Sequence, residues 1–263
     1  MSASYRTIIV ASFRRSGTHL TLDALRRNFP QCRGWKFPGE GLDRLYVNLD
    51  AVDDKAHHDY LSSSRAMGIL KRTKRPLLKT HNIESFRKLT DIAVYQDYDV
   101  IYVARHPFAV LRSLHRYCAG LDPETPANIS DFLRGYSIDG LRPPEAWDRH
   151  VRAFYSSSFK PFTLQYENLV NSPEQALKSV ADHFGLETGD ICGIVPRPHA
   201  SIRRSRLSRI LHVSPEATTV LPRSPSASSA LQSNLSAADR AFVISECSTA
   251  MEMCGYSLGT CDE

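Results

Sequence analysis

A loop suited to holding a phosphate follows the first apolar run of the chain. Thr7 to Ser12 is rich in β-branched residues and predicts a strand, and a helical pattern begins after Thr18. A glycine at a strand–loop–helix junction presents backbone N–H groups and the positive end of the helix dipole to an anion. Arg15 would add a forked cation, and Ser16 and Thr18 would add hydroxyl donors. The alternative is a tight turn capped by Ser16.

This loop differs from the loop that binds nucleoside triphosphates. That loop reads G-x-x-x-x-G-K-[ST], in which the lysine grips the phosphates and the hydroxyl holds magnesium. Here only Gly17 is present, no Lys-Ser or Lys-Thr pair follows it, and no later aspartate is placed for magnesium. The sequence therefore predicts phosphate binding without a metal, and a kinase with a degenerate loop is the weaker alternative.

A histidine that can act as a general base ends a second predicted strand, Pro76–His81. Its imidazole titrates near neutral pH, which suits proton abstraction from a reacting group. Lys79 and Thr80 precede it, and open α/β sheets place their sites at the carboxyl ends of strands. The alternative is a structural histidine, since the chain has ten.

The strand and helix signals alternate along the chain, which predicts an α/β fold with a mainly parallel sheet flanked by helices. Further strands are expected at Val100–Arg105 and Phe162–Tyr166, and a helix with an apolar stripe from Val110 to Leu121 follows Pro107. Ser172 and Ser236 each precede an apolar helical pattern, with Gln175 and Asp239 three residues later, so both are predicted to form capping boxes. We expect a single domain over residues 1–263, with a C-terminal helix at 236–255.

Four segments together resemble, in order and spacing, the sulfotransferases that use 3′-phosphoadenosine 5′-phosphosulfate (PAPS). The segments span roughly residues 5 to 190. They are Phe13–Thr18, similar to the 5′-phosphosulfate loop P-[KR]-S-G-T-T; Leu77–His81, similar to the K-T-H strand; Tyr102–Pro107 with Ser113, similar to the 3′-phosphate motif; and Leu164–Leu169 with Ser172-Pro173, similar to the Y-E-D-L segment. The resemblance implies a P-loop-like architecture, resembling nucleoside-triphosphate hydrolases, and a PAPS-dependent sulfotransferase.

The resemblance also implies roles for individual residues. His81 would be the catalytic base, Arg15 would bridge the leaving 5′-phosphate and the sulfuryl oxygens, and Lys79 would be a second cation there. Arg105 and Ser113 would hold the 3′-phosphate, and Tyr166 would contact the adenine side. The loop residues expected to bind the donor are Arg14, Arg15, Ser16, Gly17, Thr18 and His19.

Two parts of the family pattern are missing from the sequence. The loop continues His19-Leu20 where many members have tryptophan stacked on adenine, and the C-terminal R-K-G motif is not evident. Arg203 and Arg204 could replace that motif, with residues 196–236, which are basic and then rich in serine and proline, as a lid.

Composition bounds the class of protein. Hydrophobic residues make up 42% and charged residues 23% of the chain, which excludes disordered and fibrous classes. No apolar run approaches the roughly 20 residues of a membrane helix and no signal peptide is evident, so a cytoplasmic protein is expected. The six cysteines form no C-x-x-C pair, which predicts neither a disulfide framework nor a metal site.

The acceptor is not identified by any motif. Residues 32–75 and 118–155 should shape its site, and a small metabolite, a glycan or a lipid with a hydroxyl or amine are all open. The net charge of +5 suggests an anionic ligand, and a non-catalytic polyanion-binding protein is an alternative, although no nucleic acid is expected. The basic run Lys71–Arg75 is a solvated face, part of an acidic-acceptor site or a nuclear signal. The sequence leaves the oligomeric state open.

Overall fold

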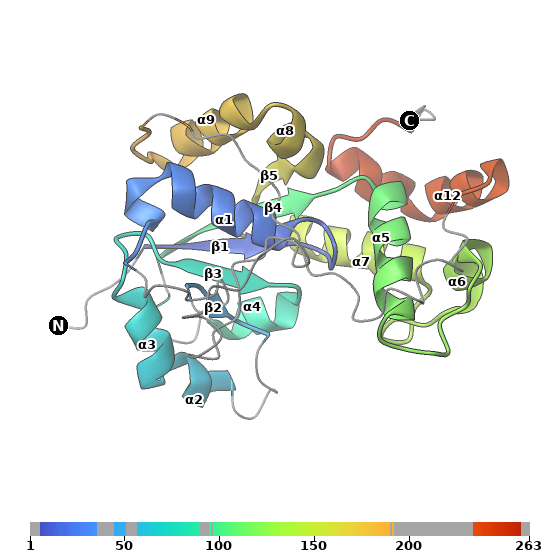
Figure 1. The fold of residues 1–263 in the computed structure, drawn as a ribbon, viewed down its shortest axis with the longest axis horizontal. Coiled ribbons are helices and arrows are strands. Elements are labelled where there is room, and N and C mark those ends of the chain that lie inside the picture. The colour runs from blue at the N-terminus through green and yellow to red at the C-terminus, as the bar shows by residue number, and fades with distance from the viewer. Residues whose placement is uncertain are drawn as a thin grey trace, which may run out of the picture. The chain divides into compact units, whose positions relative to one another are not determined.

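Five short strands form one sheet in the order β2-β3-β1-β4-β5 (Figure 1). The computed structural model describes residues 6–35, 45–50, 57–89, 95, 97–189, 191 and 234–258. The strands are β1 (Thr7–Ala11), β2 (Val47–Asn48), β3 (Leu77–Thr80), β4 (Tyr98–Ala104) and β5 (Phe162–Gln165). β1 pairs in parallel with β3 and with β4, and β2 pairs in parallel with β3. The predicted α/β class with a parallel sheet is confirmed.

The chain divides into two compact units. The first contains residues 1–12, 17–103 and 159–220, and the second contains residues 13–16, 104–158 and 221–263. Helices of the first unit are α1 (Thr18–Asn28), η1 (Pro30–Cys32), α2 (His57–Leu61), α3 (Ser64–Leu70), α4 (Ile83–Leu89), α8 (Tyr166–Asn171) and α9 (Pro173–Phe184). Helices of the second unit are α5 (Pro107–Ala119), α6 (Ile129–Gly135), α7 (Pro143–Tyr155) and α12 (Ala237–Met253).

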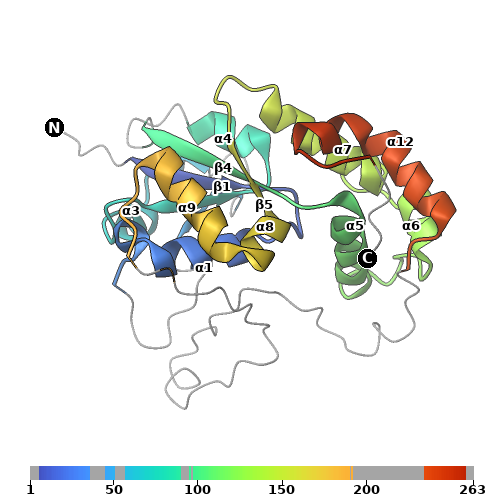
Figure 2. The ribbon, with the colours of Figure 1, turned by 90° about the horizontal axis from the view of Figure 1, so that it is seen from above.

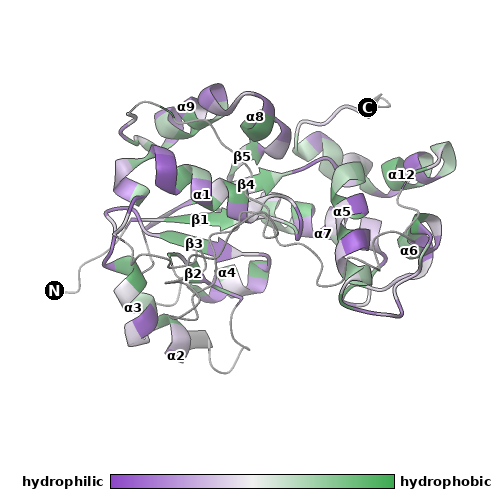
Figure 3. Ribbon diagram, viewed as in Figure 1, coloured by the Kyte–Doolittle hydropathy of each residue, from purple (hydrophilic) through white to green (hydrophobic). Residues whose placement is uncertain are grey.

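The first unit is built in layers around the sheet. Helices α1, α8 and α9 lie on one face, and α3 and α4 lie on the other (Figures 1 and 2). β1 is buried along its whole length, as expected of a central parallel strand, and the middle strands are the most hydrophobic part of the ribbon (Figure 3). The core between the sheet and the first helix layer includes Ile8, Val10, Leu22, Leu25, Ile101, Val103, Leu164, Leu177 and Val180. This packing fixes where β1 ends and where α1 begins, and therefore the two ends of the loop between them.

The second unit is helical apart from the end of β4. Helix α12 packs mainly along α7 and also contacts α5, and α6 contacts both α5 and α7. Its buried side chains include Leu111, Leu114, Phe132, Trp147, Val151, Phe154, Val243, Cys247 and Met251. The helix predicted from Ser236 is present, and Ser236 forms the predicted capping box with Asp239.

Two local predictions are wrong. Ser172 precedes α9 but makes no side-chain capping bond, because it is also the C-terminal cap of α8 and its N–H bonds to the carbonyl of Asn168. Leu121 was expected on the apolar stripe of the helix after Pro107, but α5 ends at Ala119 and Leu121 is exposed. Of the proposed lid, residues 196–233 lie outside the described residues. Within the described ranges, no helix is both long and apolar enough to cross a membrane.

Candidate active site

The phosphate loop leaves β1 where that strand has neighbours on both sides. β1 lies between β3 and β4, and the strand order reverses direction at this point of the sheet. Open α/β sheets bind ligands beyond the carboxyl ends of the strands at such a switch point. Gly17 caps α1 with φ 99°, and α1 carries no acidic residue in its first turn. Its first N–H groups and the dipole thus favour an anion.

The glycine of the loop is required by Tyr166. A Cβ on Gly17 would lie 2.4 Å from Cδ2 of Tyr166, and the positive φ of Gly17 is itself unfavourable for other residues. The tyrosine predicted to contact the nucleotide therefore packs on the phosphate loop, within the first unit. A larger residue at Gly17 would displace the ring.

His81 is held at the carboxyl end of β3 in a defined tautomer. Its Nδ1 lies 2.7 Å from the backbone carbonyl oxygen of Ser12, which can only accept a hydrogen bond. Nδ1 must therefore carry the proton in the neutral ring, and Nε2 carries the lone pair. The Ser12 hydroxyl lies 3.3 Å from the same Nδ1 and 2.5 Å from the hydroxyl of Thr18, so the histidine and the loop share one hydrogen-bonded group.

Asp50 is the residue of this cluster that the sequence analysis missed. One carboxylate oxygen accepts from the backbone N–H of His81 at 2.7 Å, and the other accepts from the hydroxyl of Thr80 at 2.8 Å. The carboxylate thus fixes the two residues that end β3. Asp50 follows the two-residue strand β2, which is too short for periodicity to reveal. The segment Leu45–Leu49 before the aspartate, which is apolar except for Asn48, was the available signal.

Lys79 and His19 are also placed in the first unit. Lys79 lies on β3 and is 8% exposed, so it is not a solvated lysine. His19, in the first turn of α1, has Nε2 3.0 Å from the hydroxyl of Tyr46, which is itself buried. The hydroxyl of Tyr46 thus holds the ring of His19, which the sequence predicts to contact the donor.

The second unit brings Arg15, Arg105 and Ser113 together. Nη1 of Arg105 donates to the backbone carbonyl of Arg15 at 3.0 Å, and Nε of Arg15 donates to the hydroxyl of Ser113 at 3.2 Å. The residues expected to hold the 5′- and 3′-phosphates therefore contact each other directly. They come from the loop, from the residue after β4 and from the second turn of α5.

Arg15 is held in an unusual conformation and environment. Its φ is 71°, in the left-handed region that non-glycine residues seldom adopt. Burial lowers the pKa of its guanidinium, and the positive charge of Arg105 lowers it further, although the nearby Tyr117 opposes this. Its guanidinium carbon lies 4.9 Å from the centroid of the Tyr117 ring. No carboxylate of the described residues forms an ion pair with Arg15, so a bound phosphate would relieve the repulsion.

The remaining loop residues have structural partners. The Phe13 ring packs edge-on against His150 of α7 at 5.4 Å between centroids, and the N–H of Ser16 donates to the carbonyl of Phe13 at 3.2 Å. Arg14 is half-exposed and lies 3.8 Å from Asp139. Arg203 and Arg204 lie outside the described residues. The structure thus groups the predicted site residues into two clusters, one in each unit.

The sheet and the helices on its two faces define an α/β protein, with a glycine loop at the end of its central strand. The sequence model of the sulfotransferase domain matches residues 6–204, well over half of the chain. The chain therefore belongs to the sulfotransferase family and is an enzyme of that class. No curated protein sequence matches it.

Several solved structures share the fold at low sequence identity. The sulfotransferase domain from the curacin biosynthetic pathway has a TM-score of 0.52 at 15% identity, covering 98% of this chain and 100% of that one. Mouse sulfotransferase SULT7A1, complexed with PAP, has a TM-score of 0.52 at 15% identity, covering 95% of this chain and 86% of that one. Retinol dehydratase, in a complex with retinol and PAP, has a TM-score of 0.50 at 15% identity, covering 96% of this chain and 83% of that one. This likeness confirms the architecture.

Proposed function

We propose that this protein transfers a sulfuryl group from PAPS to a hydroxyl or amine of a small-molecule acceptor, with His81 as the base. Membership of the sulfotransferase family supports the reaction class. PAP, the product of such a donor, is bound in two of the structural neighbours. One of them also binds retinol, a small lipid alcohol, which favours a small molecule, lipids included, over a glycan.

The donor fits the residues of the two clusters. The N-terminus of α1 with Gly17, Ser16 and Thr18 would bind the 5′-phosphate through N–H and hydroxyl donors, with Arg14 at the edge of the loop. Arg105 and Ser113 would hold the 3′-phosphate, and Tyr166 and His19 would lie toward the adenine. Arg203 and Arg204, which lie outside the described residues, are proposed as further donor-binding cations in place of the missing R-K-G motif.

The residues of this chain would position the donor and remove the proton of the acceptor. In the transfer, the bond from sulfur to the 5′-phosphate oxygen breaks while a bond from sulfur to the acceptor oxygen or nitrogen forms. Nε2 of His81 takes the acceptor proton, and the resulting imidazolium keeps its Nδ1–H on the carbonyl of Ser12. Arg15 and Lys79 would offset the negative charge that develops on the bridging oxygen. The guanidinium serves as a clamp, because it does not give up its proton at neutral pH.

The contact between Nδ1 of His81 and the carbonyl of Ser12 is the observation that carries this proposal. A carbonyl partner for Nδ1 prepares Nε2 to accept a proton before any substrate binds, which a histidine placed only for packing does not require. Metal ions have no part in this proposal.

Calorimetric titration with PAP in the absence of magnesium tests the donor, with ADP as the matched ligand that lacks the 3′-phosphate. We expect micromolar binding of PAP and at least tenfold weaker binding of ADP. Equal affinities would contradict the roles of Arg105 and Ser113. Binding only in the presence of magnesium would support a kinase instead.

A further inference from the structure

A basic cavity lies in the first unit, away from the phosphate loop. Its volume is about 570 Å³, and it is lined by Pro30, Gln31, Arg33, Lys71, Arg72, Thr73, Lys74 and Glu187. These residues follow the C-terminus of α1, precede β3 and follow α9. The phosphate loop and His81 lie at the other ends of α1 and β3. The 11 residues of α1 alone span about 16 Å, so the cavity is distinct from the donor site.

The walls of the cavity are fixed by the backbone. The N–H of Arg75 donates to the carbonyl of Gln31 at 2.9 Å, which joins the segment after α1 to the segment before β3. Gly34 packs so closely on Thr73 that a Cβ there would lie 2.8 Å from its methyl group. Arg33 donates to the carbonyls of Arg26 and Arg27 at the end of α1, which fixes its guanidinium at the rim. The basic residues are thus presented on a formed surface.

The charges around the cavity are unbalanced. Four cations line it, Arg33, Lys71, Arg72 and Lys74, against the single carboxylate of Glu187. Lys71 and Lys74 are exposed, and no carboxylate of the described residues forms an ion pair with them. The four cations line one open cavity, and their shared position favours a localised anion.

The last residue of the same basic run behaves differently. Arg75 is 12% exposed, pairs with Asp99 and donates to the carbonyl of Phe184 at 3.4 Å. It therefore serves the fold, whereas its neighbours Lys71 to Lys74 face the cavity. Arg72 lies with its guanidinium carbon 4.5 Å from the centroid of the Trp35 ring, so this cation is held in place by an aromatic ring.

We propose that this cavity is a second anion site, which binds a small molecule carrying two or more phosphate or sulfate groups. Its volume lies in the range of small-molecule sites, about 300–1,000 Å³. Two exposed ammonium groups and two guanidinium groups match several charged oxygens rather than one carboxylate. The buried hydroxyl of Thr73 has no partner among the described residues and is a further donor in the wall of the cavity. The proposal does not depend on the donor or on His81.

Tryptophan fluorescence gives a local measurement of binding. The chain has two tryptophans, Trp147, which is 1% exposed, and Trp35, which is 58% exposed and contacts Arg72. The protein is titrated with inorganic pyrophosphate and tripolyphosphate at about 150 mM NaCl, with saturating PAP to occupy any donor site. We expect saturable binding of one equivalent that is tighter for tripolyphosphate, because the cavity offers several cations. Orthophosphate should bind more weakly than either.

Charge variants distinguish a site from general basicity. Lys71→Gln with Lys74→Gln should weaken tripolyphosphate binding at least tenfold. Arg65→Gln with Lys178→Gln removes the same charge from exposed helix positions outside the cavity and should leave binding within twofold. Glu187→Gln should strengthen binding several-fold, since it removes the one opposing charge.

Three results would overturn the proposal. An equal loss in both double variants would mean that diffuse charge attracts the anion. Failure of tripolyphosphate to saturate below about 10 mM would mean that no site exists. Tighter binding of a single-stranded oligonucleotide through the same lysines would assign the surface to a long polyanion. In each case PAP binding is measured separately, so the donor proposal stands or fails by itself.

Discussion

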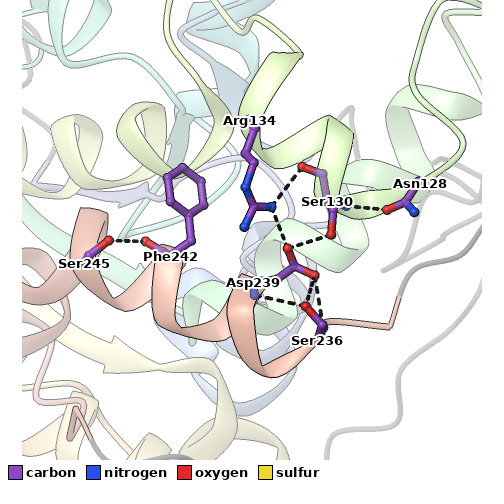
Figure 4. A network of polar contacts seen from close by, with 7 residues as sticks. All are labelled: Asn128, Ser130, Arg134, Ser236, Asp239, Phe242 and Ser245. Carbon is purple, nitrogen blue, oxygen red and sulfur yellow. Dashed lines mark hydrogen bonds and ion pairs between the residues drawn. The ribbon is translucent and has the colours of Figure 1, made fainter.

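Two carboxylates, Asp50 and Asp239, each organise a polar network, and they do so to different ends. Asp50 lies at the edge of the sheet and bonds to Thr80 and to the N–H of His81. Asp239 lies in the first turn of α12 and accepts from the hydroxyls of Ser130 and Ser236 and from Arg134 (Figure 4). Both carboxylates accept several hydrogen bonds, but only one of them holds a titratable ring.

The difference between the networks concerns what each holds in place. In the helix network, Arg134 neutralises the carboxylate and also lies over the ring of Phe242, at 4.7 Å from its centroid. Its charges and hydrogen bonds join α6 to α12 and serve stability. In the strand-edge network, the carboxylate fixes the backbone of His81 while Ser12 fixes its ring, so the geometry selects the tautomer of the neutral ring. We therefore expect mutations in the strand-edge network to change activity and mutations in the helix network to change folding stability.

The largest effect is expected from His81→Asn. The asparagine amide can still donate to the carbonyl of Ser12, but it has no group in the place of Nε2. We expect turnover to fall by about 10²–10⁴-fold, the usual contribution of a general base, with unchanged PAP affinity and unfolding midpoint. Loss of PAP binding together with turnover would show instead that His81 supports the fold of the loop.

Asp239→Ala should have the next largest effect, and on stability alone. It removes a capping box and a charge-assisted hydrogen bond, worth about 1 and about 1.5–3 kcal/mol, and half-exposure of Arg134 reduces the second value. We expect a loss of about 2–3 kcal/mol in urea unfolding with unchanged PAP affinity. An altered PAP affinity at full folding would contradict the division between the two networks.

The pH dependence of stability follows from the same residue. Burial raises the pKa of the Asp239 carboxyl, but hydrogen bonds from Ser130, Ser236 and Arg134 outweigh it, so the pKa lies well below its usual range. A depressed folded pKa means that the stability is present above the unfolded pKa of about 3.9 and is lost as the pH falls below it. The free energy of unfolding should therefore differ less between pH 6 and pH 3 for Asp239→Asn than for the wild type.

Arg105→Gln tests the cluster of the second unit. We expect PAP binding to weaken by about 10–100-fold, because the 3′-phosphate loses a charged partner. ADP binding should change little, since ADP has no phosphate at that position. A similar loss for both nucleotides would mean that Arg105 acts through the backbone of Arg15, to which it donates.

The parts that sequence patterns predicted are those with local or repeated signals. The strands at Thr7 and Leu77, the glycine loop and the capping box at Ser236 all follow from neighbouring residues. Asp50 could not be found that way, because it reaches His81 from 31 positions away, after a strand of only two residues. The capping prediction at Ser172 failed for a related reason, since its role depends on the preceding helix.

The smallest effect, and the sharpest test of the strand-edge network, is expected from Asp50→Asn. The asparagine amide keeps one acceptor oxygen, but its NH2 group faces either the N–H of His81 or the hydroxyl of Thr80. One of the two hydrogen bonds is therefore replaced by two donors that face each other. His81 then keeps its chemistry but loses part of its orientation, so we expect kcat to fall by about tenfold with an unchanged KM for the donor. The pH profile of kcat should change as the ring gains freedom, whereas a merely structural aspartate would lower activity equally at every pH. Asp59→Asn, an exposed change in α2, is the matched control. A normal pH profile with a lowered unfolding midpoint would place Asp50 beside Asp239, as a residue of the fold.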